Sequence, residues 1–129
     1  MKKQIENRED ISLLVNTFYT KIRANTEIGF YFNDMIKDWD EHLEKLIDFW
    51  EMNLFAIKKY NGNPIEAHNK VDAYFNHQIS SHEFGIWLNI WFETLDELFE
   101  GENVDTLKRR ARKMSTFLYL SMFENRPKG

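Results

Sequence analysis

The chain has 129 residues, with 17 basic and 21 acidic side chains and a formal net charge of −4. This length suits one folded domain over residues 1–129, and the acidic balance argues against a nucleic-acid surface over the whole molecule. The absence of cysteine excludes disulfides, thiolate metal sites and cysteine nucleophiles. The first ten residues lack the apolar core of a secretory signal, and no apolar run reaches membrane-spanning length. We therefore expect a cytoplasmic protein without membrane or nucleic-acid partners, and by default a monomer.

Apolar residues recur at helical spacing in the first half of the chain, which predicts helices and no strands. In the first helix they are Ile11, Val15, Phe18 and Ile22. The third segment has an apolar arc wider than one stripe, which indicates contacts on two of its sides. The predicted segments are a helix over 10–25, a turn of helix over 28–34 and a helix over 38–57.

The second half begins with a loop over 58–63, marked by Asn61-Gly62-Asn63. Asn63 as N-cap, Pro64 at the first helical position and Glu66 in a capping box predict a short helix from Pro64. The following segments are irregular chain over 69–79, a helix from Ser80 or Ser81 to about 100 and a helix over 103–124, with 1–8 and 127–129 as loose ends. The predicted class is all-α.

The last helix carries a local basic run within an otherwise acidic chain. Its predicted buried stripe comprises Val104, Leu107, Ala111, Met114, Leu118 and Met122. The basic residues are Lys108, Arg109, Arg110, Arg112 and Lys113. Most of them point away from the stripe, so we interpret the run as a solvated helix face.

One histidine on the short helix has an unusual setting. His68 lies three residues after Ile65 and three before Val71, so the three share an apolar face. Such a residue can be a core histidine whose hydrogen-bonding groups have partners, or it can hold a metal that belongs to an apolar cofactor.

The sequence lacks the motifs of several other kinds of catalytic or metal site. A di-iron site needs Glu-x-x-His, but the residues three before the four histidines are Trp39, Ile65, Tyr74 and Ile79. His-Glu-x-x-His, Gly-x-Ser-x-Gly and glycine-rich phosphate loops are also absent. The candidates that remain are imidazoles and aromatic side chains.

Three polar side chains on other helices could accompany His68. Tyr19 lies on the inner side of the first helix, His42 shares a face with Leu46 and Phe49, and Trp87 is an indole donor near the start of the long helix after Ser81. Each could also serve only the core or the surface. Together they form the set that an open ligand position on a haem iron requires.

At this point the sequence resembles a known family, the group III truncated haemoglobins, from about residue 8 to residue 127. The segments that carry the resemblance are Phe18-Tyr19, Tyr31-Phe32-Asn33, Trp39-x-x-His42, Phe49-Trp50, Tyr60-Asn61-Gly62-Asn63-Pro64 with His68, Phe84-x-x-Trp87-Leu88 and Arg110-Ala111. Groups I and II usually carry paired glycines, whereas this chain has no Gly-Gly. The sequence departs from the pattern at Glu83, because many members have histidine before the phenylalanine.

The resemblance implies a two-over-two helical globin around a non-covalent haem b. By position, His68 resembles the proximal iron ligand, Tyr19 the distal tyrosine and His42 the distal histidine that often acts as a gate. Trp87 resembles the indole that closes the distal pocket, and Phe32 the aromatic residue that packs on the porphyrin. The family also lines this pocket at the positions of Leu46, Phe49 and Trp50. Candidates for the propionate partners are Lys45, Arg110 and Arg112.

The implied function is the binding of O2, NO or CO at a five-coordinate iron, with NO detoxification or other oxygen chemistry as its use and a reductase of unknown identity as a partner. Two alternatives stay open at this stage. One is a peroxidase-like activity in which His42 and Tyr19 handle protons. The other is a cofactor-free helical interaction module whose aromatic residues are all core.

Overall fold

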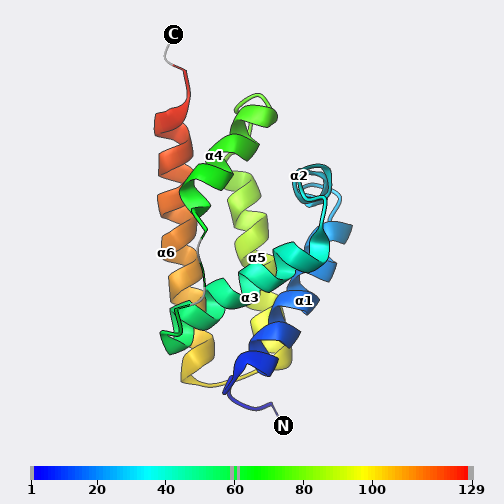
Figure 1. The fold of residues 1–129 in the computed structure, drawn as a ribbon, viewed down its shortest axis with the longest axis vertical. Coiled ribbons are helices and arrows are strands. Elements are labelled where there is room, and N and C mark those ends of the chain that lie inside the picture. The colour runs from blue at the N-terminus through cyan, green and yellow to red at the C-terminus, as the bar shows by residue number, and fades with distance from the viewer. Residues whose placement is uncertain (1, 59, 61, 128–129) are drawn as a thin grey trace.

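The computed structural model describes residues 2–58, 60 and 62–127, and this part of the chain is built of helices (Figure 1). The predicted all-α class is confirmed. The helices are α1 Arg8–Ala24, α2 Gly29–Met35, α3 Trp39–Phe55, α4 Pro64–Tyr74, α5 Ser81–Leu98 and α6 Glu102–Asn125.

Two helix pairs form the body of the molecule. α1 packs on α3, α5 packs on α6, and α1 also packs on α5, which joins the two pairs. α4 lies along α6 near its carboxyl end (Figure 1). The junction is aromatic: Trp91 is fully buried, with its ring centroid 4.6 Å from that of Trp50 in a stacked arrangement and 4.9 Å from that of Phe18.

The predicted helix starts arise from local capping. The side chain of Asn63 accepts a hydrogen bond from the backbone N–H of Glu66, with Pro64 in the first turn. Ser80 and Glu83 form a reciprocal capping box that begins α5. These bonds satisfy N–H groups that have no partner within the helix, so both boundaries follow from a few neighbouring residues.

The chain between α4 and α5 differs from the prediction. Irregular structure was expected over 69–79, whereas α4 continues to Tyr74. Asp72 explains the extra turns, because its carboxylate is 1% exposed and pairs with Arg126 beyond the end of α6. The predicted loop over 58–63 is confirmed where it is described; Asn61 of its turn signal lies outside the described residues.

The amino-terminal segment is also more ordered than the prediction of a loose end over 1–8. Ile5 is fully buried, and the backbone of Lys3 forms a bridge with Phe99. The side-chain amide of Asn103 donates to the carbonyl of Ile5 over 2.7 Å. An apolar side chain and its backbone partners therefore hold residues 3–5 against the α5–α6 turn.

α6 has the two faces predicted for it. Val104, Leu107, Ala111, Leu118 and Met122 are buried and Met114 is half-buried. The exposed basic residues are Arg109, Arg110, Arg112 and Lys113. Among the described residues, no helix combines the length and the apolar character needed to cross a membrane.

Candidate functional site

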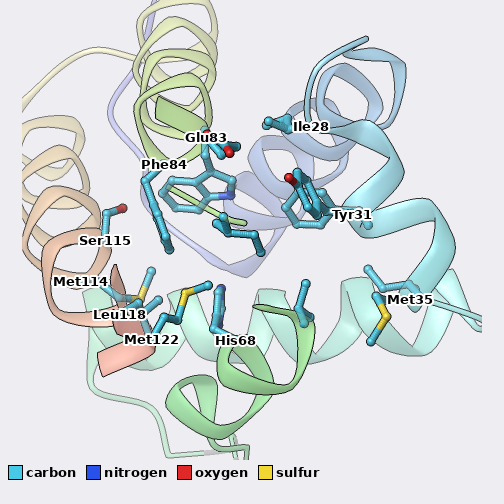
Figure 2. Close-up of a pocket in the computed structure, with 15 residues that line it drawn as sticks. Ile28, Tyr31, Met35, His68, Glu83, Phe84, Met114, Ser115, Leu118 and Met122 are labelled. Carbon is cyan, nitrogen blue, oxygen red and sulfur yellow. The ribbon is translucent and has the colours of Figure 1, made fainter. Parts of the chain in front are cut away.

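A cavity with mainly apolar walls lies among α2, α4, α5 and α6 (Figure 2). Phe32 comes from α2, His68 from α4, and Phe84 and Trp87 from α5. The inner face of α6 adds Met114, Leu118 and Met122 to the wall. The structure thus brings three of the predicted site residues, Phe32, His68 and Trp87, to one cavity.

His68 projects from α4 into this cavity with one ring nitrogen already engaged (Figure 2). Its Nδ1 lies 2.6 Å from the carbonyl oxygen of Pro64, so Nδ1 carries the proton and donates it to that oxygen. Burial lowers the pKa of His68, although the bond to Pro64 acts in the opposite direction. The neutral ring is left with a lone pair on Nε2, as a metal-binding imidazole requires.

The two residues predicted to share an apolar face with His68 lie in different environments. Val71 lines the cavity, whereas Ile65 is 36% exposed. Residues three before and three after a helical position point about 60° to either side of it, so a cavity on one flank covers only one of them. The aromatic neighbour of His68 in space is Phe84, whose ring centroid lies 6.5 Å away with nearly parallel planes.

A second group of polar side chains centres on Tyr19 of α1. Tyr19 is 5% exposed, and the indole N–H of Trp87 lies close enough to its hydroxyl to act as a donor that lowers the pKa of Tyr19. Burial raises the pKa of Tyr19 well above its usual value, with partial relief from Trp87, so the phenol keeps its proton. Since the indole can only donate, the phenolic proton remains available for a bound ligand.

His42 stands beside this pair. Its ring centroid is 5.9 Å from that of Tyr19 and 5.6 Å from that of Trp39, both edge to face. Burial, with smaller contributions from the charge of Lys45 and from His68 when it is protonated, lowers the pKa of His42 to about 4. His42 is therefore neutral at physiological pH and can accept or relay a proton.

The remaining predicted site residues lie on α3. Leu46 and Phe49 are half-buried against the core, and Trp50 is buried under Trp91. Lys45 is exposed, with its ammonium 3.7 Å from the carboxylate of Glu41 one helical turn earlier. Their roles toward a ligand stay predictions.

The other two cations predicted as candidate propionate partners already have contacts within the protein. Arg110 donates to the backbone carbonyl of Asn53 near the end of α3. The guanidinium of Arg112 lies 5.1 Å from the centre of the Phe92 ring. Of the three candidate propionate partners, Lys45 therefore has the weakest existing contact within the protein.

Sequence reasoning missed the group that holds α4 in place. The guanidinium of Arg126 donates to both carboxylate oxygens of Asp72, over 3.0 and 3.1 Å. His77 Nδ1 lies 3.2 Å from the same carboxylate, and the backbone N–H of Ile79 donates to it. Asp72 follows His68 by one helical turn, and an acid on that face was a signal for a buried ion pair.

Replacing Arg126 with alanine is expected to destabilise the fold by about 2–4 kcal/mol, because it leaves the Asp72 carboxylate buried without its cation. Urea unfolding followed by circular dichroism measures this change, with the exposed Arg109→Ala as control. Burial alone would raise the pKa of Asp72, but hydrogen bonds from Arg126 and His77 outweigh it and keep the pKa below its usual value. The contribution of the pair should therefore persist in mild acid and fall only as the pH drops through that lowered pKa. A loss below 1 kcal/mol would contradict this role.

The low pKa of His42 predicts a second loss of stability in acid, at pH values above those at which the Asp72 pair is lost. An unfolded histidine titrates near pH 6.5 and folded His42 near pH 4, so between these values the unfolded chain binds more protons. Stability should therefore fall as the pH drops from about 6.5 toward 4, and His42→Leu should remove about 1–2 kcal/mol of that decrease. Unfolding at a series of pH values measures it, with the exposed His82→Gln as control. His68 contributes in the same direction, so part of the slope remains; an unchanged slope in His42→Leu would refute the assignment.

No family model matches the chain, but two other comparisons with known proteins find a similar one. The group 3 truncated hemoglobin ctb of Campylobacter jejuni subsp. jejuni serotype O:2 is 29% identical over 120 residues, which are 90% of this chain and 91% of that protein. The crystal structure of group III truncated hemoglobin from Campylobacter jejuni superposes with a TM-score of 0.85 at 27% identity, covering 99% of this chain and 100% of that one. The predicted two-over-two globin fold and the resemblance to the group III truncated haemoglobins are confirmed.

Proposed function

We propose that the chain binds haem b, with Nε2 of His68 as the iron ligand, and takes O2, NO or CO at the remaining iron position. The observation that carries the proposal is the neutral imidazole on the cavity wall, oriented through Nδ1 by Pro64, with the indole of Trp87 on the same cavity. The resemblance to the group III truncated haemoglobins implies a haem cofactor. It also implies that the role includes gas binding.

The residues present fit such a cofactor. The walls are mainly apolar, as a porphyrin face requires, and Phe32 and Phe84 supply rings to stack on it. We assign Leu46, Phe49 and Trp50 to the α3 side of the pocket. Lys45 is the candidate partner for a propionate, because its exposed contact with Glu41 contributes little and is easily exchanged.

A bound haem would supply a ferrous iron for a diatomic gas, and O2 held there would carry partial negative charge. The hydroxyl of Tyr19 can donate a hydrogen bond to such a ligand, while the N–H of Trp87 holds the oxygen of that hydroxyl in place. A hydrogen bond to a charged acceptor contributes about 1.5–3 kcal/mol. We therefore propose slow release of O2, which suits conversion of NO to nitrate better than bulk oxygen delivery.

Rapid mixing tests this chemistry. Ferrous, haem-loaded protein in air-saturated buffer is mixed with one equivalent of NO, and the nitrate formed and the iron oxidised are measured. The proposal predicts about one nitrate per oxidised iron, and continued turnover then requires a reductase. Recovery of NO as an unreacted nitrosyl complex would contradict the proposed use, while leaving gas binding intact.

The position of His42 supports a second candidate, a peroxidase-like activity. A neutral imidazole beside the Tyr19 ring could take a proton from peroxide and return it. Steady-state oxidation of a reducing dye by hydrogen peroxide tests it. Turnover that falls at least tenfold in His42→Leu would favour this activity, and turnover no faster than free haem would exclude it.

A further inference from the structure

The outer face of α6 carries large apolar side chains that point into solvent. Phe117 is 60% exposed, Leu120 is 53% exposed and Phe123 is 61% exposed. They lie on the same turns whose inner side, through Leu118 and Met122, walls the cavity. A single exposed apolar residue is ordinary, but three on consecutive turns of one helix indicate a contact surface.

The spacing of this surface is that of a helix-pairing seam. Lys113, Phe117, Leu120 and Glu124 follow one another at steps of four, three and four residues, and all four are exposed. Such steps keep side chains aligned along one edge of a helix, where they meet a second helix. Within the described part of the chain, neither Lys113 nor Glu124 has an ion-pair partner.

The order of the four residues is self-complementary when the helix is reversed. Positions 113 and 124 have the same midpoint as positions 117 and 120, so a two-fold axis at that point exchanges the members of each pair. Phe117 then meets Leu120 of the second copy, and Lys113 meets Glu124 of the second copy, each contact occurring twice. A parallel arrangement in register would place Lys113 against Lys113 and Glu124 against Glu124, which charge repulsion disfavours.

We propose that the chain forms a homodimer in which α6 packs antiparallel against α6 of a second copy through this seam. Phe123, which lies beside the seam, adds to its apolar surface on one side. Two apolar layers make a small interface, so the dimer is a weak one that forms at micromolar or higher concentration. This replaces the default expectation of a monomer, and it does not depend on what the cavity binds.

Sedimentation velocity of the full chain, from low micromolar to millimolar concentration, tests the dimer. The mass is expected to double with concentration, and Leu120→Asp is expected to remain monomeric throughout. Leu13→Asp is the matched control, because Leu13 on α1 is a leucine of similar exposure, 50%, outside the seam. Circular dichroism confirms that each variant is folded.

Charge exchange tests the antiparallel register. Lys113→Glu and Glu124→Lys should each raise the dissociation constant about tenfold, because each converts two attractions into two repulsions. The double variant K113E/E124K should restore dimerisation close to that of the original chain. A monomer at every concentration would overturn the proposal, and so would a dimer that none of these changes weakens.

Discussion

Replacing His68 with glycine is expected to lower haem affinity by at least about 100-fold and to abolish the spectrum of a five-coordinate, histidine-ligated ferrous iron. Loss of a group that only orients a metal ligand already lowers metal affinity by about 10- to 100-fold. Removal of the ligand itself should lower it further. Spectral titration with haem measures the affinity. Millimolar imidazole should restore the ferrous spectrum, because the glycine leaves room for the ring that was removed.

The control for this experiment is His82→Ala. His82 is exposed, its Nε2 lies 2.8 Å from the carboxylate of Glu27, and neither residue lines the cavity. Its replacement should leave haem binding unchanged. If His68→Gly binds haem with unaltered affinity and spectrum, the iron ligand is a different residue, and His42 would be the first to examine.

Tyr19→Phe is expected to accelerate O2 dissociation from the ferrous haem-loaded protein by one to two orders of magnitude. The variant removes only the hydroxyl, so the edge contacts of the ring with Phe18 at 4.9 Å and Phe32 at 5.8 Å remain. A donor worth about 1.5–3 kcal/mol corresponds to that range at 1.4 kcal/mol per tenfold. Stopped-flow replacement of O2 by CO measures the rate.

Trp87→Phe separates the donor from the group that orients it. The variant loses the N–H that acts on the Tyr19 hydroxyl but keeps an aromatic ring against Phe18 and Trp91. We expect an intermediate acceleration, and CO dissociation, which develops less charge on the ligand, should change less in both variants. An O2 dissociation rate that Tyr19→Phe leaves unaltered would contradict the assignment of the phenol as the donor.

The helices could be predicted from the sequence where short-range chemistry decides them. Asn63, Pro64 and Glu66 indicate the start of α4, and the Ser80 cap with Glu83 indicates the start of α5. Interactions within four residues suffice for both, so the sequence pattern is enough.

The end of α4 could not be predicted in this way. After Tyr74 the chain turns at Asn76 and His77, both with positive φ near 60°, and neither is a glycine that would mark such a turn. The N–H of His77 donates to the carbonyl of Asp72 over 2.7 Å, and Arg126 holds the carboxylate of Asp72 from the far end of the chain. Asp72 on the His68 face indicates a buried ion pair, but its partner lies 54 residues away, so the neighbouring residues do not specify where α4 ends.

For the candidate site, too, the sequence predicts the residues but not the properties that depend on contacts between distant segments. The residue types and helices of Tyr19, His42, His68 and Trp87 were predicted from the sequence and from the family resemblance. The approach of the Trp87 indole to Tyr19 depends on how α5 crosses α1, and the low pKa of His42 depends on the depth at which α3 packs. Helix packing sets both properties, and sequence spacing on separate helices does not specify it.

The most direct test of the central claim is the absorption spectrum of the purified protein during titration with haem, before and after reduction and addition of CO. The account predicts a strong Soret band that saturates at one haem per chain and a ferrous CO complex with the shifted band of histidine-ligated iron. A fully helical protein whose spectrum never differs from that of free haem would contradict the account. It would favour the alternative of a cofactor-free helical interaction module.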